Sequence, residues 1–274
     1  MNEIELLEIA GVGLIAGTWG ALIGAGGGFI IVPLLLLLEE DMTAAGVTAV
    51  SLVAVCANGM SGTGAYARMR RIDYRSGILF MMSTLPGSVM GAILINHIGK
   101  TLFQVVFGGL LVLVAAYVFA KPRPKARYGT TSTGIPRRIV DSRGAVYEYS
   151  VNFKLGMCIA FLVGFMASTL GVGGGIFNVP AFVFVLGMPI QVATATSQLM
   201  VMGTSMVANI TNIVQGDLWG KWSITMTLTV GSVVGAQLGA RLSQRISSLL
   251  IARILATGLL VVGLRLVYGG ITSF

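Results

Sequence analysis

Long apolar runs, separated by short clusters of charged residues, restrict the fold of this chain of 274 residues more than any other feature. A helix of about 20 residues, rising ~1.5 Å per residue, crosses a hydrocarbon layer of about 30 Å. Charged residues make up only 10% of the chain, whereas soluble domains carry about 25%. We therefore expect an all-α polytopic membrane protein.

The apolar runs fall into two sets on either side of a polar stretch. We expect helical segments at residues 5–23, 28–38, 43–67, 76–95 and 101–120, and then at 153–170, 175–187, 190–214, 223–240 and 249–270. The intervening residues are rich in Pro, Gly and basic side chains, which cannot lie in lipid. We expect residues 1–120 to form a first transmembrane repeat and 153–274 a second. Residues 121–152 would be a basic cytoplasmic linker with a hairpin around Arg143-Gly144.

The positive charge is localised. The chain carries a formal charge of +8, with +3 in residues 68–75 and +6 in residues 121–154. In a soluble protein such a balance would suggest nucleic acid, but two basic loops in a membrane protein follow the positive-inside rule. We expect no nucleic-acid partner, and contact between the basic linker and anionic lipid headgroups.

The two halves of the chain are copies of each other. Three stretches recur in the same order: residues 24–33 at 171–180, 47–51 at 193–197, and 87–94 at 231–238. Internal duplication is typical of secondary transporters. Three collinear matches are much stronger evidence for duplication than one glycine-rich match.

The charges also orient the two copies. Segments 28–38 and 175–187 are too short to cross a membrane alone, so each copy is expected to turn back through a short, re-entrant segment. Five segments per copy is an odd number, which inverts the second copy. With both basic loops inside, this arrangement places Glu39 and Asp41 outside and Arg241 inside. We expect two inverted repeats of about five helical segments each.

Two glycine turns are the sharpest local feature. Glycine allows left-handed backbone and close approach to a ligand, and each turn begins a short helix whose N-terminus favours an anion. Related by an inverted repeat, the turns would face each other near the membrane midplane. We predict a backbone cradle formed by Gly26, Gly27, Gly28, Gly173, Gly174 and Gly175. Helix packing is the alternative, and it is the preferred interpretation of the GxxxG pairs at 87–91 and 231–239.

Polar side chains inside the apolar runs are candidate donors to a substrate. Asn178 follows the second turn, where Ile31 follows the first, and a buried amide is costly to leave unpaired. We predict substrate contacts from Asn178, Ser197 and Gln198, with Thr48 and Ser51 as their counterparts. The alternative for a single Ser or Thr is a hydrogen bond back to its own helix.

Several chemistries have no support in the sequence. No carboxylate falls well inside an apolar run, so none offers itself as an intramembrane proton carrier. No Walker motif is present, and His97 is the only histidine. We expect no enzyme activity, no metal, no cofactor and no direct use of ATP.

The doubled GxGGGxxxVP motif at 24–33 and 171–180, with Thr-Ala-x-Ser steps at 48–51 and 194–197, resembles the TauE/SafE family of sulfite exporters and organosulfonate permeases. The resemblance covers essentially the whole chain. It implies transport of sulfite, a sulfonate or a related small anion across the bacterial inner membrane. The long basic linker and the absence of an asparagine at position 31 depart from the family pattern.

These observations predict a secondary transporter that exports a small sulfur-containing anion by alternating access, alone or as a homo-oligomer. An inside-negative potential favours outward movement of each negative charge by about 2.3 kcal/mol per 100 mV. The alternatives are a non-transporting accessory or scaffold subunit and a passive anion channel. A membrane enzyme ranks below these, because no nucleophile–base pair can be assembled.

Overall fold

The computed structural model describes residues 3–39, 41–120, 134–243 and 248–272. Nine of the expected apolar runs form a helix within a few residues of their expected bounds, and the run 175–187 forms a short α-helix followed by a π-helical segment. The helices are α1 (Glu3–Ile23), α2 (Gly28–Leu38), α3 (Ala44–Arg68), α4 (Tyr74–Leu94), α5 (Lys100–Ala120), α6 (Phe153–Thr169), α7 (Gly175–Pro180), α8 (Ile190–Gln215), α9 (Trp222–Leu242) and α10 (Ser248–Thr272). Four described stretches are long and apolar enough to cross a membrane: Leu6–Ile23, Ala44–Arg68, Tyr74–His97 and Trp222–Leu242. The chain therefore has the expected architecture of a helical membrane protein.

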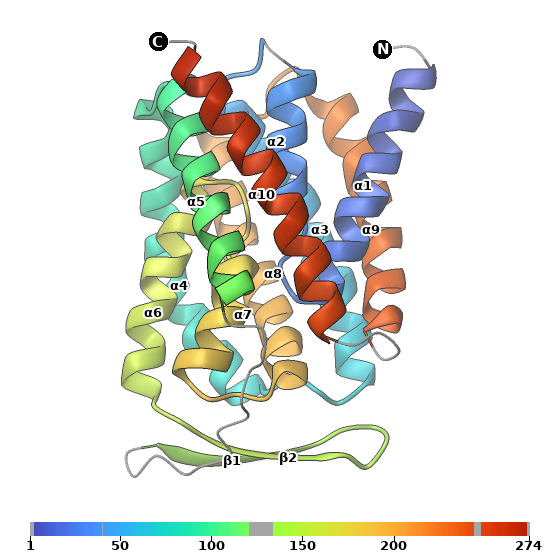
Figure 1. Cartoon of the computed structure of the whole chain (residues 1–274), viewed down its shortest axis with the longest axis vertical. Coiled ribbons are helices and arrows are strands. Elements are labelled where there is room, and N and C mark those ends of the chain that lie inside the picture. The colour runs from blue at the N-terminus through green and yellow to red at the C-terminus, as the bar shows by residue number, and fades with distance from the viewer. Residues whose placement is uncertain (1–2, 40, 121–133, 244–247, 273–274) are drawn as a thin grey trace.

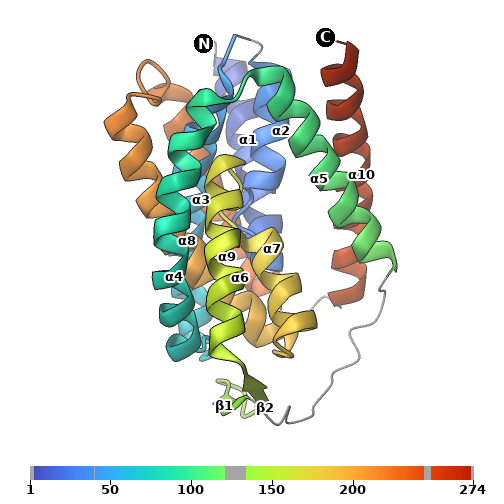
Figure 2. The ribbon, with the colours of Figure 1, turned by 90° about the vertical axis from the view of Figure 1, so that its left-hand side faces the viewer.

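Helices from the two halves are interleaved (Figures 1 and 2). Helix α1 packs along α9, and α6, which holds the place of α1 in the second half, packs along α4. Helices α3 and α8 pack on each other, and α5 and α10 lie together at one edge of the bundle. Each of these helices thus buries a face against the other half, so that neither half would bury its apolar faces alone.

The α1–α9 and α4–α6 pairs are packed through glycine. The glycines lie against carbonyl oxygens of the partner helix: Gly231, Gly235 and Gly239 of α9 against Ala10, Leu14 and Thr18, and Gly87 and Gly91 of α4 against Phe161 and Phe165. A methyl group at any of these glycines would collide with that oxygen. The prediction that the GxxxG pairs serve close helix packing is confirmed.

The short helices differ after their prolines. Helix α2 continues through Pro33 as an α-helix to Leu38. In the second half, α7 ends at Pro180 and the chain continues as a π-helical segment, η2 (Ala181–Val185). Proline lacks the N–H that would complete the α-helical ladder, so this is the point at which either helix can change its pitch. A one-turn 3₁₀ helix, η1 (Ile95–His97), extends α4.

A two-stranded hairpin follows the first half. Strand β1 (Ile135–Val140) pairs antiparallel with β2 (Val146–Val151), and the turn contains Gly144 with a φ of 82°. The hairpin expected around Arg143-Gly144 is confirmed, while residues 121–133 of the linker lie outside the described residues. The hairpin lies across one end of the bundle, and the start of α1 and the end of α10 lie at the other end (Figure 1).

Candidate functional site

The two glycine turns adopt the backbone that their sequence predicts. Gly26 and Gly27 have φ angles of 79° and 91°, and Gly173 and Gly174 have φ angles of 77° and 88°. Residues with a Cβ rarely occupy this left-handed region. Gly27 and Gly174 are the N-caps of α2 and α7, and neither cap supplies a side-chain hydrogen bond.

The turns contact each other through their backbones. A Cβ on Gly28 would lie 2.5 Å from the carbonyl oxygen of Gly171, and a Cβ on Gly175 would collide with the carbonyl oxygen of Gly24. A side chain at either position would force the turns apart. The structure therefore brings the predicted glycines together, with one set from each half of the chain.

Two serines cross between the halves to hold these turns. Ser51 Oγ donates to the carbonyl oxygen of Gly171 at 2.7 Å, and Ser197 Oγ donates to that of Gly24 at 2.7 Å. Both serines are fully buried. Their hydroxyl hydrogens are therefore committed to the turns, which gives both residues a structural role beside the substrate contact that the sequence predicts.

Thr48 and Asn178 differ in what they can offer a ligand. Thr48 Oγ1 donates to the carbonyl oxygen of Ala45 in its own helix at 2.9 Å, which is the alternative stated for a lone threonine. Asn178 is 1% exposed, and its Oδ1 has no hydrogen-bond partner among the described residues. Asn178 therefore retains a free polar atom next to the second turn.

Gln198 is held by an amide pair between α8 and α3. Its Nε2 donates to Asn58 Oδ1 at 2.8 Å, and Asn58 Nδ2 donates to the carbonyl oxygens of Gly17 and Ser232 at 2.9 and 3.1 Å. Because carbonyls accept only, these bonds fix the orientation of both amides. Gln198 Oε1 is left buried and without a partner in the described part of the chain.

A further row of polar side chains lies on α8. Ser205, Asn209 and Asn212 are spaced by four and three residues, which places them on one helix face. Each has a buried polar atom without a partner among the described residues, and Ser205 Oγ lies 3.0 Å from the place of a Cβ on Gly173. None of these three residues is among the predicted substrate contacts, although their spacing was the signal that could have found them.

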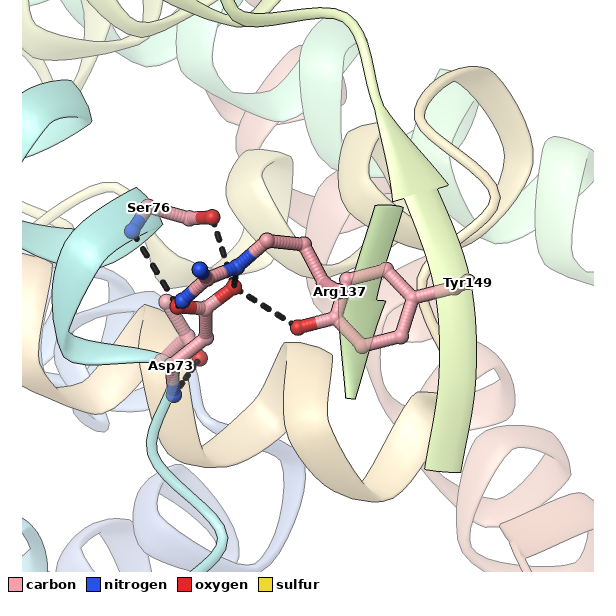
Figure 3. A network of polar contacts seen from close by, with 5 residues as sticks. Asp73, Ser76, Arg137 and Tyr149 are labelled. Carbon is pink, nitrogen blue, oxygen red and sulfur yellow. Dashed lines mark hydrogen bonds and ion pairs between the residues drawn. The ribbon is translucent and has the colours of Figure 1, made fainter. Parts of the chain in front are cut away.

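Asp73 forms the densest polar network of the described residues, at the hairpin end (Figure 3). Its carboxylate accepts from Ser76 Oγ at 2.6 Å, from Tyr149 Oη at 2.7 Å and from the guanidinium of Arg137. The Asp73 side chain is 0% exposed. Its backbone N–H donates to Thr196 Oγ1 at 3.0 Å, one residue before Ser197. The hairpin is thus connected to the segment that holds the first glycine turn.

This network keeps Asp73 ionised. Burial alone would raise the pKa of the carboxyl, but the hydrogen bonds from Arg137, Ser76 and Tyr149 outweigh burial and lower the pKa below its ordinary value. Burial and the adjacent carboxylate raise the pKa of Tyr149, so its hydroxyl remains a donor. In this arrangement the Asp73 carboxylate holds the hairpin as an anion.

The described residues offer few side chains for metal binding or thiol chemistry. There, no three His, Cys, Asp or Glu side chains converge into a group that could hold a metal ion. Cys56 and Cys158 are free thiols on α3 and α6.

Comparison with known proteins decides the family. The sequence profile of the family described as "Sulfite exporter TauE/SafE" matches residues 9–266, nearly the whole chain. The chain belongs to the TauE/SafE family. The resemblance given by the doubled glycine motif is thereby confirmed, and the chain is a multi-pass membrane transporter of the TauE/SafE type.

Relatives of this TauE/SafE chain carry matching names. It is 34% identical to the "Probable membrane transporter protein YunE" of Bacillus subtilis over 96% of this chain and 97% of that protein. It is 27% identical to a "Probable membrane transporter protein" of Xylella fastidiosa, over 84% and 82% of the two chains. The "Probable membrane transporter protein YfcA" of Escherichia coli K12 is 24% identical, over 80% and 74%. No solved structure matches the chain. These names agree with the expectation that the chain is not an enzyme.

Proposed function

We propose that this protein is a secondary transporter that exports a small sulfur-containing anion, such as sulfite or an organosulfonate, across the bacterial inner membrane. The observation that carries the proposal is the backbone contact between the two glycine turns, beside the free buried amide oxygen of Asn178. Buried polar atoms are costly to leave unpaired. Water, or a group of the substrate that carries a hydrogen, could donate to this oxygen.

The substrate would bind beside the contact between the two turns, whose backbones already touch. Gly26, Gly27 and Gly28 would form one side of the cradle and Gly173, Gly174 and Gly175 the other. Asn178 of α7, together with Gln198 and the row Ser205–Asn209–Asn212 of α8, would supply polar contacts. The Asn178 amide and the Ser205 hydroxyl could turn a donor toward an oxyanion without trapping it by a fixed charge. Gln198, whose Nε2 is bound to Asn58, would offer only its oxygen, to water or to a protonated group of the substrate.

Alternating access would follow from two inverted repeats. The packing of helices from one half on those of the other supports this interpretation. Helix α1 packs on α9 as α6 packs on α4, and α3 and α8 pack on each other. Such a set of pairs is what a two-fold relation between the halves would produce. One set of helices could then rock against the other around the central turns.

The hairpin end would face the cytoplasm. Basic side chains gather there at helix ends, among them Arg68, Arg75, Lys154 and Arg241, while Glu39, Asp41 and Asp217 lie in the connections at the opposite end. The positive-inside rule supports a cytoplasmic position for the hairpin. An inside-negative potential would drive an anion outward without a coupled proton.

Efflux from liposomes tests the proposal. Purified protein would be reconstituted with sulfite, taurine, sulfoacetate or sulfate inside, and efflux would be followed under an imposed potential. Saturable, potential-dependent efflux of one anion supports an exporter. Efflux that never saturates would indicate a passive channel, and no efflux of any anion would favour an accessory subunit. Uphill movement driven only by a proton gradient would contradict uncoupled export.

Asn178 supplies the variant that ties flux to the site. Asn178→Asp keeps the shape of the side chain but adds a negative charge beside the turns, so anion efflux should fall at least about tenfold. Asn178→Ala should reduce efflux less. Asn96→Ala, which removes an exposed amide at the end of α4, is the matched control and should leave efflux unchanged.

A further inference from the structure

Two ion pairs attach the hairpin to the first half of the chain, and each partner supplies one arginine and one aspartate. Arg137 of β1 pairs with Asp73 of the α3–α4 connection, and Arg71 of that connection pairs with Asp141 of the hairpin turn, Nη2 to Oδ2, at 3.0 Å. The side chains of the two acids are 0% and 1% exposed. Separating either pair would leave a buried carboxylate without its cation, so both pairs resist being broken.

Backbone contacts strengthen the same attachment. Ser142 N–H donates to the carbonyl oxygen of Met69 at 3.0 Å. Arg70, the residue after Met69, has a φ of 55° and is the one non-glycine residue with positive φ in the described part of the chain. Such backbone persists only where surrounding contacts hold it. The α3–α4 connection is therefore kept in a strained shape under the hairpin.

The hairpin also packs on the second half. Tyr149 and Val151 of β2 are buried in one apolar cluster with Phe182 of η2, Met188 of the connection before α8, and Val192 of α8. The hairpin thus bridges the α3–α4 connection of the first half and the η2–α8 segment of the second. Any motion that separates these two parts at this end must first displace the hairpin.

The Asp73 network extends this bridge toward the central turns. Asp73 N–H donates to Thr196 Oγ1, and the adjacent Ser197 holds the carbonyl oxygen of Gly24. The Asp73 carboxylate therefore accepts hydrogen bonds from Arg137 and Tyr149 of the hairpin (Figure 3), and its backbone contacts the segment that supports the first glycine turn. Departure of the hairpin would remove Arg137 and Tyr149 from this carboxylate.

We propose that the hairpin is a latch, which closes this end of the transporter by clamping the α3–α4 connection to the η2–α8 segment and must leave Asp73 before the end can open. The proposal rests on the alternating access proposed above. It makes Arg137 and Tyr149 positioning residues that act on the access of solvent to the interior, without contact with the substrate.

Thiol labelling measures that access without any substrate. In protein that carries Cys56→Ala and Cys158→Ala, Met188→Cys places one buried thiol beneath the hairpin, and Leu218→Cys, in a second protein, places one at the opposite end. Met188 and Leu218 are each 2% exposed. Labelling by a charged maleimide in detergent then reports how often each end opens.

Arg137→Ala should accelerate labelling at position 188 by about tenfold or more, because an unpaired buried carboxylate favours release of the hairpin. Labelling at position 218 should stay within about twofold. Arg138→Ala is the matched control, since the neighbouring Arg138 pairs with Glu148 at the exposed surface. Tyr149→Phe removes one hydrogen bond to Asp73 and keeps the ring, so it weakens the attachment less. It serves as the second variant if Arg137→Ala fails to fold.

Equal labelling at position 188 in the Arg137 and Arg138 variants would overturn the latch. So would equal acceleration at both ends in Tyr149→Phe, because the hairpin would then stabilise the whole bundle and control neither end in particular. Failure of the efflux experiment would count against the proposed transport alone, since labelling at position 188 requires no transported anion.

Discussion

The connections α3–α4 and α8–α9 hold the same place in the two halves but are secured in different ways. At the α3–α4 connection, Asp73 lies buried beneath the hairpin and pairs with Arg137. At the α8–α9 connection, Asn96 Nδ2 donates to Gln215 Oε1 at 2.8 Å and to Asp217 Oδ2 at 3.1 Å, in contact with solvent. Exposed polar contacts contribute little to stability, whereas buried charge pairs resist being broken.

The difference shows how a duplicated chain can become asymmetric. The central turns remain equivalent, down to the crossed bonds from Ser51 to Gly171 and from Ser197 to Gly24. The asymmetry between the two ends comes from the hairpin. Among the described residues, no similar hairpin covers the α8–α9 connection at the opposite end. The two halves therefore share the crossed bonds at the centre and differ in how the connection at each end is secured.

Breaking the buried pair should have the largest effect on stability. Arg137→Ala leaves the Asp73 carboxylate without its cation, and we expect a loss of about 3–5 kcal/mol. Asn96→Ala at the other connection should cost less than about 1 kcal/mol. Denaturant unfolding in detergent micelles measures both. Similar losses in the two variants would contradict the asymmetry between the ends.

The equivalence of the two turns predicts matched losses. Gly28→Ala and Gly175→Ala each place a methyl group against the backbone of the other turn, so each should lose about 3 kcal/mol of unfolding free energy. Gly64→Ala on α3 is the control, because nothing lies within 4 Å of its added Cβ, and alanine there should gain up to about 1 kcal/mol. Clearly unequal losses at the two turns would show that the halves differ at the centre as well.

Much of this arrangement could be predicted from the sequence. Apolar runs fix the helices because segment length and lipid thickness are linked, and the left-handed glycines follow from their clustering. The partners of Ser51 and Ser197 could not be predicted, because each bond joins residues more than a hundred positions apart. The Asp73–Arg137 pair was missed for the same reason, since sequence shows charges in two loops but not which of them meet. The substrate roles of the glycines, Asn178 and Gln198 stay predictions.

A smaller loss is expected when one hydrogen bond to Asp73 is removed. Tyr149→Phe deletes the hydroxyl that donates to Oδ2 at 2.7 Å while it keeps the ring in its apolar cluster. A bond to a charged group contributes about 1.5 kcal/mol or somewhat more. Arg138→Ala, with its exposed pair to Glu148, should change stability by less than about 0.5 kcal/mol. Denaturant midpoints of the two proteins, compared at equal slope, give the ranking.

The smallest effect is expected from pH. Because Arg137, Ser76 and Tyr149 lower the pKa of Asp73 in the folded protein, its contribution to stability is complete above the pKa of the unfolded chain, about 3.9. The contribution is lost only as pH falls through the lowered folded value. The difference in unfolding free energy between the wild type and Asp73→Asn should therefore stay constant from about pH 8 to pH 5 and shrink below about pH 4. Taking this difference cancels groups that titrate equally in both proteins. A difference that already shrinks between pH 7 and pH 5 would mean that the carboxylate is not held as the Asp73 network requires, and the closed end would then open with mild acid.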